Sequence, residues 1–459
     1  MAPSGGEIRP AFSLLPKGFS CDRIWTKKLS DMKPPVLLLV GLLPWLGRAA
    51  EIPEPVLPAG VGLNIHFNRG HTRELDRIRA GGFKFVRMDI RWDETEIRRG
   101  EYDWSAYDEL LRNLDRHGLR AILILDYSHP LYEGKVTAIN PMTNLPHETI
   151  GAPRSPDSIA AFARWAAAGA EHFRGRHVLW EIWNEPNIEF WSPEPEVKQY
   201  TALALATAKS IRAADPQATI IGPASSELPW EFLETFLRSG ILEYLDAVSV
   251  HPYRKPERPP ESATEDFRKL RGLVDQFAPR GRNIPILSGE WGYSTWTKGV
   301  SFETQAAFAV RQQLNNLACG IPLSIWYDWM NDGSNPNEKE ENWGTVFPDM
   351  KPKPSYRALR VLNHELAGYR IQHRLSLGTE SDYVLLLHNA AGSQKLAAWT
   401  LGEPHIVYVA LGGLSGAKLW LVDPEGKTTR LKPDSDRLGL SLSAAPHYVR
   451  LGSVKVLTP

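Results

Sequence analysis

Residues 107–126, YDELLRNLDRHGLRAILILD, combine an amphipathic helical segment with the apolar run that follows it. In the helical segment, apolar residues recur at i, i+3, i+4 and i+7, which is the spacing of one helix face. These residues are Tyr107, Leu110, Leu111 and Leu114. Gly118 is expected to end the helix, because glycine readily takes the backbone conformation found just past a helix C-terminus. The apolar run 119–126 then predicts a buried strand.

The same alternation of strand and helix repeats from residue 60 to about residue 365. Short apolar runs bounded by turns alternate with longer segments of helical period. The predicted strands are residues 61–67, 83–90, 119–126, 177–184, 218–223, 245–251, 284–290 and 321–328. Eight such units predict an α/β fold, a (β/α)8 TIM barrel with some long loops. A doubly wound open sheet is the alternative, but no glycine-rich phosphate loop follows any strand.

The composition changes after residue 368. Short β-rich segments follow, separated by Gly, Asp, Asn and Pro. They include residues 383–388, 395–399, 406–410 and 417–422. We therefore predict a barrel domain at residues 50–368 and a small C-terminal antiparallel β-sandwich domain at residues 369–459.

Residues 1–49 are interpreted as a signal peptide with an upstream extension. The apolar run 34–46, PPVLLLVGLLPWL, follows Lys33 and precedes small residues at 47, 49 and 50. This order is typical of a secretory signal, and the run is short for a transmembrane helix. We predict a secreted or periplasmic protein without stable membrane insertion after cleavage; a membrane anchor is the alternative. Met1 and Met32 both remain possible start residues.

The composition argues against several classes of function. The 459 residues carry 53 Lys and Arg and 53 Asp and Glu, so the formal net charge is zero and no general nucleic-acid binding is expected. Cys21 and Cys319 are the two cysteines, too few for a disulfide scaffold or a cysteine-based zinc site. The sequence contains neither G-x-S-x-G nor H-E-x-x-H, which argues against esterases and metalloproteases.

Polar and aromatic residues gather at the carboxyl ends of the predicted strands, where barrels of this kind carry their active sites. The fourth strand ends in residues 183–187 (WNEPN), and the seventh ends in residues 287–292 (LSGEWG). Other strand ends carry Arg87, Asp89, Asp126, Glu227, His251, Tyr253, Trp326, Asp328 and Trp329. These side chains are expected to converge on one mouth of the barrel.

Two carboxyl groups on one mouth, Glu185 and Glu290, suit the cleavage of a glycosidic bond. One must protonate the leaving oxygen, while the other attacks or activates water. The two groups need different environments, so that one stays protonated and the other ionised. Arg87 and Tyr253 are expected to keep Glu290 ionised, because a cation and a hydrogen-bond donor both favour a carboxylate.

Neighbouring residues suit sugar binding. The amide of Asn184 can hydrogen-bond a sugar hydroxyl, and Trp326 offers a flat apolar floor for a ring. For Glu227, Asp89 and Asp126 we favour structural roles, because structural ion pairs are common.

At these residues the chain resembles the retaining glycoside hydrolases of clan A. In that clan, an acid/base Glu follows an Asn at the end of the fourth strand and a nucleophilic Glu ends the seventh. Residues 180–187 (WEIWNEPN), followed by Phe190-Trp191, look most like glycoside hydrolase family 39, with family 5 as the nearest rival. The resemblance covers roughly residues 58–368. Further matches are Val86-Arg87 with Asp89, His251-Pro252-Tyr253, and Trp326.

The resemblance implies a retaining double displacement on an oligo- or polysaccharide. Glu290 would be the nucleophile and Glu185 the acid/base, with their carboxyl groups roughly 5–5.5 Å apart. It further implies that Arg87 and Tyr253 tune Glu290 and that Asn184 binds the sugar 2-hydroxyl. The remaining subsite residues would be His251, Trp326 and Trp291. No metal or organic cofactor is implied.

Several alternatives stay open. A transglycosylase would use the same residues, and a barrel that binds carbohydrate without cleaving it is a third hypothesis. The aromatic partner on the third strand is either Tyr127 or His129. The polar loop 331–342 either builds subsites or only connects elements. For the C-terminal domain we favour packing against the barrel over sugar binding.

Overall fold

The computed structural model describes residues 51–140, 145–415 and 417–457. The predicted signal peptide at residues 1–49 lies outside these described residues.

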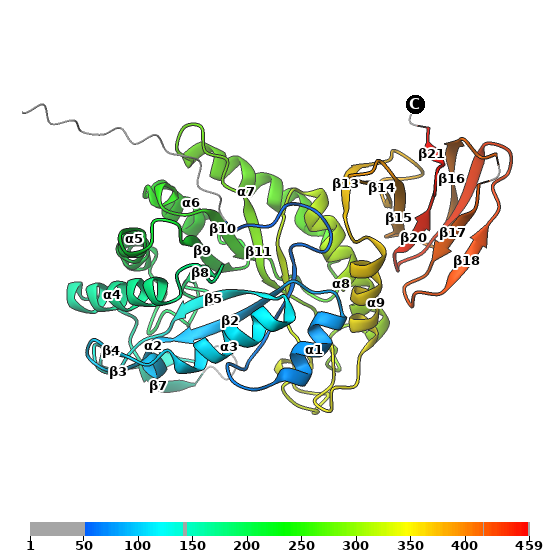
Figure 1. The fold of residues 1–459 in the computed structure, drawn as a ribbon. Helices are drawn as coiled ribbons and strands as arrows, with labels where there is room; N and C mark the ends of the chain where they lie inside the picture. Colours follow the sequence, from blue (N-terminus) through cyan, green and yellow to red (C-terminus); the bar gives the residue numbers. More distant parts are fainter. Residues whose placement is uncertain (1–50, 141–144, 416, 458–459) are drawn as a thin grey trace, which may run out of the picture. The chain divides into compact units, whose positions relative to one another are not determined.

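Eight parallel strands close into a barrel in the order β1-β12-β11-β10-β9-β8-β5-β2 (Figure 1). The strands are β1 (Val61–Asn64), β2 (Phe85–Arg91), β5 (Arg120–Asp126), β8 (Leu179–Ile182), β9 (Thr219–Ser226), β10 (Ala247–His251), β11 (Ile286–Trp291) and β12 (Ser324–Trp326). Each predicted strand corresponds to one of them, so the predicted TIM barrel is confirmed and the open sheet is wrong.

Helices follow the strands and surround the barrel (Figure 1). They are α1 (Thr72–Ala80), α2 (Trp92–Thr95), α3 (Ser105–His117), α4 (Pro156–His172), α5 (Val197–Ala214), α6 (Trp230–Arg238), α7 (Thr264–Phe277), α8 (Phe302–Ala318) and α9 (Pro354–Glu365), with short 3-10 turns η1 (Ile241–Glu243), η2 (Pro260–Ala263) and η3 (Glu340–Asn342). Gly118 follows α3 with φ 63°, the left-handed conformation expected there. Ser155 and Ser301 cap the N-termini of α4 and α8 through their hydroxyls. None of the helices among the described residues is long and apolar enough to cross a membrane.

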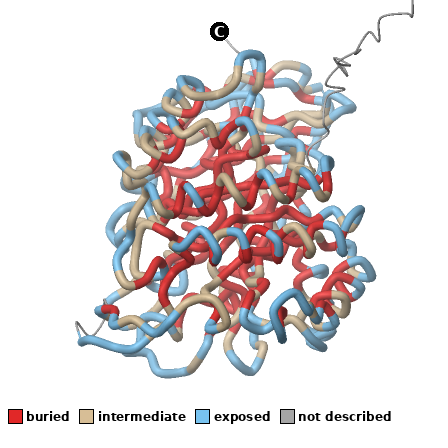
Figure 2. The backbone as a smooth tube through the Cα atoms, turned by 90° about the vertical axis from the view of Figure 1, so that its left-hand side faces the viewer, coloured by how far each residue is buried: buried red, intermediate tan, exposed pale blue. Residues whose placement is uncertain are grey.

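The inside of the barrel is packed with side chains from seven of the eight strands, β1 being the exception, and from Leu323 just before β12. The cluster consists of Phe85, Ile122, Leu179, Ile221, Ala247, Leu287, Leu323 and Ile325. A second apolar layer lies between the strands and the helices, and Figure 2 shows these buried segments in the centre of the molecule. Nearer the carboxyl ends of the strands the interior becomes polar. A Cβ at Gly289 would lie 2.3 Å from Ser249 Oγ and 3.1 Å from Glu181 Oε1, so glycine makes room there for buried polar groups.

Two small hairpins that the sequence did not predict interrupt the βα repeat. β3 (Glu96–Arg98) pairs with β4 (Glu101–Tyr102), and β6 (Lys135–Ile139) pairs with β7 (Pro146–Ile150). They were missed because their strands are short and mostly exposed, and none contains the apolar run of a buried strand. The β6–β7 hairpin matters for the site, because His147, Thr149 and Ile150 line the cavity described below.

The C-terminal residues form two antiparallel sheets with a separate apolar core. The first has the order β13-β14-β15-β20-β17-β18 and the second β19-β16-β21. The strands are β13 (Tyr369–Arg374), β14 (Asp382–Asn389), β15 (Gln394–Thr400), β16 (His405–Gly412), β17 (Leu419–Val422), β18 (Thr428–Leu431), β19 (Arg437–Leu442), β20 (His447–Arg450) and β21 (Lys455–Val456). This confirms the predicted C-terminal β region.

A buried ion pair connects this region to the barrel. Arg311 on α8 donates to both carboxylate oxygens of Glu261, at 2.8 and 2.6 Å. Trp399 on β15 donates its indole N–H to Glu261 Oε1 at 2.8 Å. On α9, Glu365 accepts from Lys395 and Arg450 of the β region. The β region therefore packs against the barrel, as expected.

Candidate active site

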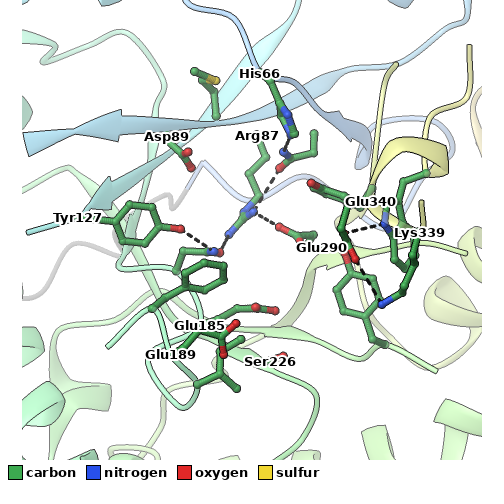
Figure 3. A pocket seen from close by; sticks show the side chains of 18 of the residues that line it. His66, Arg87, Asp89, Tyr127, Glu185, Glu189, Ser226, Glu290, Lys339 and Glu340 are labelled. Carbon is green, nitrogen blue, oxygen red and sulfur yellow. Dashed lines mark hydrogen bonds and ion pairs between the residues drawn. The ribbon is translucent and has the colours of Figure 1, made fainter. Parts of the chain in front are cut away.

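A cavity of about 1390 Å³ opens at the carboxyl ends of the barrel strands. Glu185, Glu290, Arg87, Asn184 and Tyr253 all line it, so the structure brings these five predicted site residues together. Figure 3 shows Arg87 in the middle of the group, with Glu290 to one side and Glu185 below. This cavity is the candidate active site.

Glu290, at the end of β11, is held by two donors. Its Oε1 accepts a hydrogen bond of 2.7 Å from the Tyr253 hydroxyl, and its Oε2 contacts Arg87 Nη1. Burial, and then the charge of Glu290, raise the pKa of Tyr253 well above its usual value, so the phenol stays a donor. These contacts fix both oxygens of Glu290 at the cavity wall.

Arg87, on β2, contacts side chains from several strands of the site. It is 1% exposed, and its Nε donates to Glu181 Oε2 at 2.6 Å. Its Nη1 also reaches Asn64 Oδ1 at 3.2 Å, and its Nη2 reaches Asn184 Oδ1 at 2.7 Å. Burial alone would lower the pKa of Arg87, but Glu181 and Glu290 outweigh it and hold that pKa above its usual value. The guanidinium is therefore a permanent buried cation paired with two carboxylates.

Glu185 faces the cavity from the segment just after β8. Successive side chains of a regular strand point to opposite faces, so adjacent residues such as Asn184 and Glu185 cannot both face inward from one. Here the strand ends at Ile182, and Trp183 and Glu185 take the left-handed conformation with φ 68° and 47°. This conformation is unfavourable for such residues, and strain of this kind gathers at functional sites. The turn lets both side chains line the cavity.

The environment of Glu185 differs from that of Glu290. Burial, followed by the charges of Glu189 and Glu227, raises the pKa of Glu185 to about 7, against the opposing effects of a Ser226 hydrogen bond and of Arg87. A carboxyl group with a pKa near neutrality can both give and take a proton.

His251, at the end of β10, contacts both Arg87 and Glu185. Its Nε2 lies 3.2 Å from Arg87 Nη2, and its Nδ1 lies 2.9 Å from Glu185 Oε1. An arginine only donates, so Nε2 must accept and Nδ1 must carry the proton that it donates to Glu185. Burial lowers the pKa of His251 to about 4, which keeps the ring neutral. His251 was expected to line the subsite, but it is 0% exposed and does not line the cavity. It supports Glu185 instead.

One carboxylate oxygen of Glu185, one of Glu290 and a ring nitrogen of His251 lie within 4.8 Å of one another. Arg87 contacts Glu290 and His251 directly, and His251 contacts Glu185. The positive charge of Arg87 therefore opposes the binding of a metal ion by this group. A second group, His66, Asp328 and Asp332, also lies within 4.8 Å. Its aspartates outweigh burial and raise the pKa of His66 to about 9, so we interpret this group as an ion-pair cluster.

Comparison with known protein families identifies the family of this chain. A family model described as Cellulase (glycosyl hydrolase family 5) matches residues 59–333, more than half of the chain. The chain belongs to this glycoside hydrolase family. The resemblance to clan A glycoside hydrolases is thereby confirmed.

Solved structures place the same fold in family 39 as well. A family 39 glycoside hydrolase from Bacteroides cellulosilyticus WH2 superposes with a TM-score of 0.73 at 23% identity, covering 87% of this chain and 83% of that chain. A family 39 β-xylosidase from Caulobacter crescentus gives a TM-score of 0.62 at 19% identity, covering 90% of this chain and 98% of that chain. At these identities the likeness shows the fold.

Curated relatives are named β-xylosidase. The protein of Caldicellulosiruptor saccharolyticus is 24% identical over 216 residues, which is 43% of each chain. The protein of Geobacillus stearothermophilus is 30% identical over 119 residues, which is 22% of this chain and 23% of the relative. The matched part thus spans less than half of either relative.

Two tryptophans expected in the subsite of this glycoside hydrolase are placed elsewhere. Trp291 and Trp326 are both 0% exposed, and neither lines the cavity. Each is adjacent to a residue that does line it, Glu290 and Tyr327 respectively. Both tryptophans pack near the Tyr293 ring, with centroids 6.1 and 6.4 Å away. Tyr327, and not Trp326, is the aromatic residue that lines the cavity at the end of the eighth barrel strand.

The structure bears on two of the open alternatives, the aromatic residue of the third strand and the loop 331–342. Tyr127 lines the cavity and accepts a hydrogen bond of 3.0 Å from Asn184 Nδ2. His129 instead lies 2.9 Å from the carbonyl oxygen of Glu96, away from the cavity. Lys339 and Glu340 of loop 331–342 line the cavity, so the loop builds part of the site of this glycoside hydrolase (Figure 3).

Several residues of the site were not predicted from the sequence. Asn64 and Trp343 line the cavity, and Glu181 is the buried partner of Arg87. A signal for Glu181 was present, because a charged residue stands inside the apolar run 177–184. Among the acids given structural roles, Glu227 and Asp89 line the cavity, whereas Asp126 is fully buried. Burial raises the pKa of both aspartates.

Proposed function

We propose that this protein is a secreted β-glycosidase that cleaves an oligo- or polysaccharide with retention of anomeric configuration. The observation that carries the proposal is the pair Glu185 and Glu290, whose closest carboxylate oxygens lie within 4.8 Å. Retaining enzymes hold their carboxyl groups about 5–5.5 Å apart, whereas inverting enzymes leave about 6.5–9.5 Å for a water molecule. The spacing therefore supports retention.

In the first step, a carboxylate oxygen of Glu290 attacks the anomeric carbon. The bond from this carbon to the leaving oxygen breaks, and Glu185 gives its proton to that oxygen. The raised pKa of Glu185, about 7, supports this role because the group still holds a proton near neutrality. The product is a glycosyl ester on Glu290 and a free leaving group.

In the second step, Glu185 acts as a base. It takes a proton from a water molecule whose oxygen attacks the anomeric carbon, and the ester bond to Glu290 breaks. In the free protein Arg87 and Tyr253 contact the two oxygens of the Glu290 carboxylate and so hold its orientation for the attack. Asn184, which Arg87 and Tyr127 hold in place, is the residue that would bind the sugar 2-hydroxyl. A sugar in place of water would give transglycosylation.

The first substrates to test are β-xylosides, because the curated relatives are named β-xylosidase. The protein is incubated with aryl β-xyloside, aryl α-xyloside, xylobiose, xylan and a panel of other aryl β-glycosides, and released reducing ends are measured. We expect cleavage of at least one β-glycoside and none of the α-xyloside. Cleavage of the α-xyloside alone would refute the proposal. Products longer than the substrate would favour the transglycosylase.

The pH dependence follows from Glu185. It must be protonated to act as an acid, so kcat/KM is expected to fall as the pH rises through about 7, the pKa to which burial raises this group. The charge of Glu189 adds to this rise, so Glu189→Gln should lower the pKa. The alkaline limb of the profile should then move to lower pH by about half a unit. The measurement is kcat/KM against pH for a substrate with a poor leaving group.

Glu194→Gln is the matched control, since Glu194 is exposed and does not line the cavity. Its profile should coincide with that of the wild type. An alkaline limb at the same pH in Glu189→Gln and the wild type would contradict the assignment of Glu185.

A further inference from the structure

Lys353 is a fully buried lysine that the proposed reaction does not use. It precedes α9, is 0% exposed and does not line the cavity. Its ammonium donates to Asn331 Oδ1 at 2.7 Å, Thr295 Oγ1 at 3.1 Å and the carbonyl oxygen of Asn342 at 3.2 Å. Three donors thus meet three uncharged acceptors.

Such a burial is costly. A charged group removed from water needs compensation, which most buried lysines find in a carboxylate. The three direct acceptors of Lys353 carry no charge. Burial lowers its pKa to about 7, opposed by the charge of Asp328. A residue that breaks a packing rule in this way is expected where function requires it.

The three acceptors belong to two segments that shape the cavity. Thr295 lies in the segment after β11, while Asn331 and Asn342 are the first and last residues of loop 331–342. The backbone N–H of Thr295 also donates to the Asn342 carbonyl at 3.0 Å. The side chain of Asn342 in turn donates to the carbonyls of Asn335 and Glu338, both at 2.7 Å. The ammonium therefore joins the two ends of loop 331–342 to each other and to the segment after β11.

Trp343, the residue after Asn342, connects this loop to the side chains around Glu290. Trp343 lines the cavity, and its ring packs edge-on against Tyr253 with centroids 5.6 Å apart. It packs in the same way against Tyr327 at 5.8 Å. Tyr253 donates to Glu290. A continuous set of contacts thus joins Lys353 to the proposed nucleophile through Asn342, Trp343 and Tyr253.

We propose that Lys353 is a positioning residue that locks loop 331–342 to the segment after β11 and so holds the aromatic wall of Trp343 and Tyr253 beside Glu290. The kinetic consequence rests on the proposed function. The lock itself is a property of the fold and is measured without a substrate.

The test compares Lys353→Met with Lys351→Met in the full chain. Methionine keeps the length of the lysine side chain and removes its donors. Lys351 is the matched control, because its side chain is 79% exposed and pairs with Asp349 on the surface. Hydrogen exchange is followed by mass spectrometry for peptides covering residues 293–300 and 331–343, and kcat and KM are measured for each folded variant with an aryl β-glycoside.

In Lys353→Met, exchange should accelerate at least tenfold in these two peptides and stay unchanged in the barrel strands. Its kcat/KM should fall about 10- to 100-fold, because a displacement of about 1 Å at a site costs activity of that order. Lys351→Met should match the wild type in both measurements. Uniformly faster exchange with unchanged kinetic constants would mean a merely structural role and would overturn the proposal.

Thr295→Val keeps the test decisive if Lys353→Met does not fold. At nearly constant shape it removes one of the three acceptors, together with the 3.1 Å hydrogen bond from the Thr295 hydroxyl to the Asn342 carbonyl, so the same two peptides should exchange faster. Unchanged exchange in both peptides would refute the lock. An inactive wild-type protein would refute the proposed function, and the exchange data would still decide whether the lock exists.

Discussion

Replacing Glu290 by Gln is expected to reduce kcat/KM for a cleavable aryl β-glycoside by about 10⁴-fold or more, because removing a nucleophile costs effects of that order. An amide cannot form the glycosyl ester, although it keeps the shape of the side chain. Its oxygen can still accept from Tyr253 or Arg87, so the fold should persist. The measurement is the initial rate of phenol release, with circular dichroism to verify folding.

Glu340→Gln is the matched control for this result. Glu340 is a second carboxylate on the wall of the same cavity, but its side chain is paired with Trp343 Nε1 at 3.0 Å. Its substitution should change kcat/KM far less than that of Glu290. Activity above a tenth of the wild-type value in Glu290→Gln would contradict the nucleophile assignment.

Replacing Arg87 by Met is expected to remove both activity and stability. The guanidinium is 1% exposed and pairs with Glu181 and Glu290. Its removal leaves the Glu181 carboxylate, at 0% exposure, without its cation. Breaking a buried ion pair in this way costs about 3–5 kcal/mol. The free energy of unfolding from urea titration should fall by about that amount, and kcat/KM should fall because Glu290 and Asn184 lose their common support.

The double variant Arg87→Met with Glu181→Gln separates the two effects. It removes the orphaned charge, so part of the lost stability should return. Activity should not return, because Glu290 and Asn184 are still unsupported. An Arg87→Met protein as stable as the wild type would show that the buried network is not the support we infer.

The fold was predictable because it depends on local patterns. The alternation of apolar runs and helical stripes identifies all eight barrel strands, and the same reasoning places Glu185 and Glu290 at one mouth. The β3–β4 and β6–β7 hairpins escaped, since short exposed strands leave no such pattern. A barrel is therefore easier to predict from sequence than the loops that surround its mouth.

The direction of individual side chains was less predictable. Trp291 and Trp326 seemed suitable for sugar binding by residue type, but both are fully buried, and their neighbours Glu290 and Tyr327 line the cavity instead. Asn184 and Glu185 depart from the alternation of a regular strand through left-handed backbone at residues 183 and 185. Strained conformations of this kind depend on the surrounding structure.

Contacts between distant parts of the chain were beyond the sequence. The ammonium of Lys353 reaches Thr295, 58 residues away in sequence, and Arg87 reaches Glu181 across 94 residues. No local pattern pairs such residues. They become visible only when the strands and loops are assembled.

The central claim, retention through a Glu290 ester, is tested most directly by the configuration of the first product. The protein is mixed with a cleavable β-glycoside in D₂O, and the anomeric protons are followed by NMR from the first turnovers. We predict that the β-anomer of the released sugar appears first and that the α-anomer grows only later by mutarotation. An α-anomer formed first would mean inversion and would contradict the account.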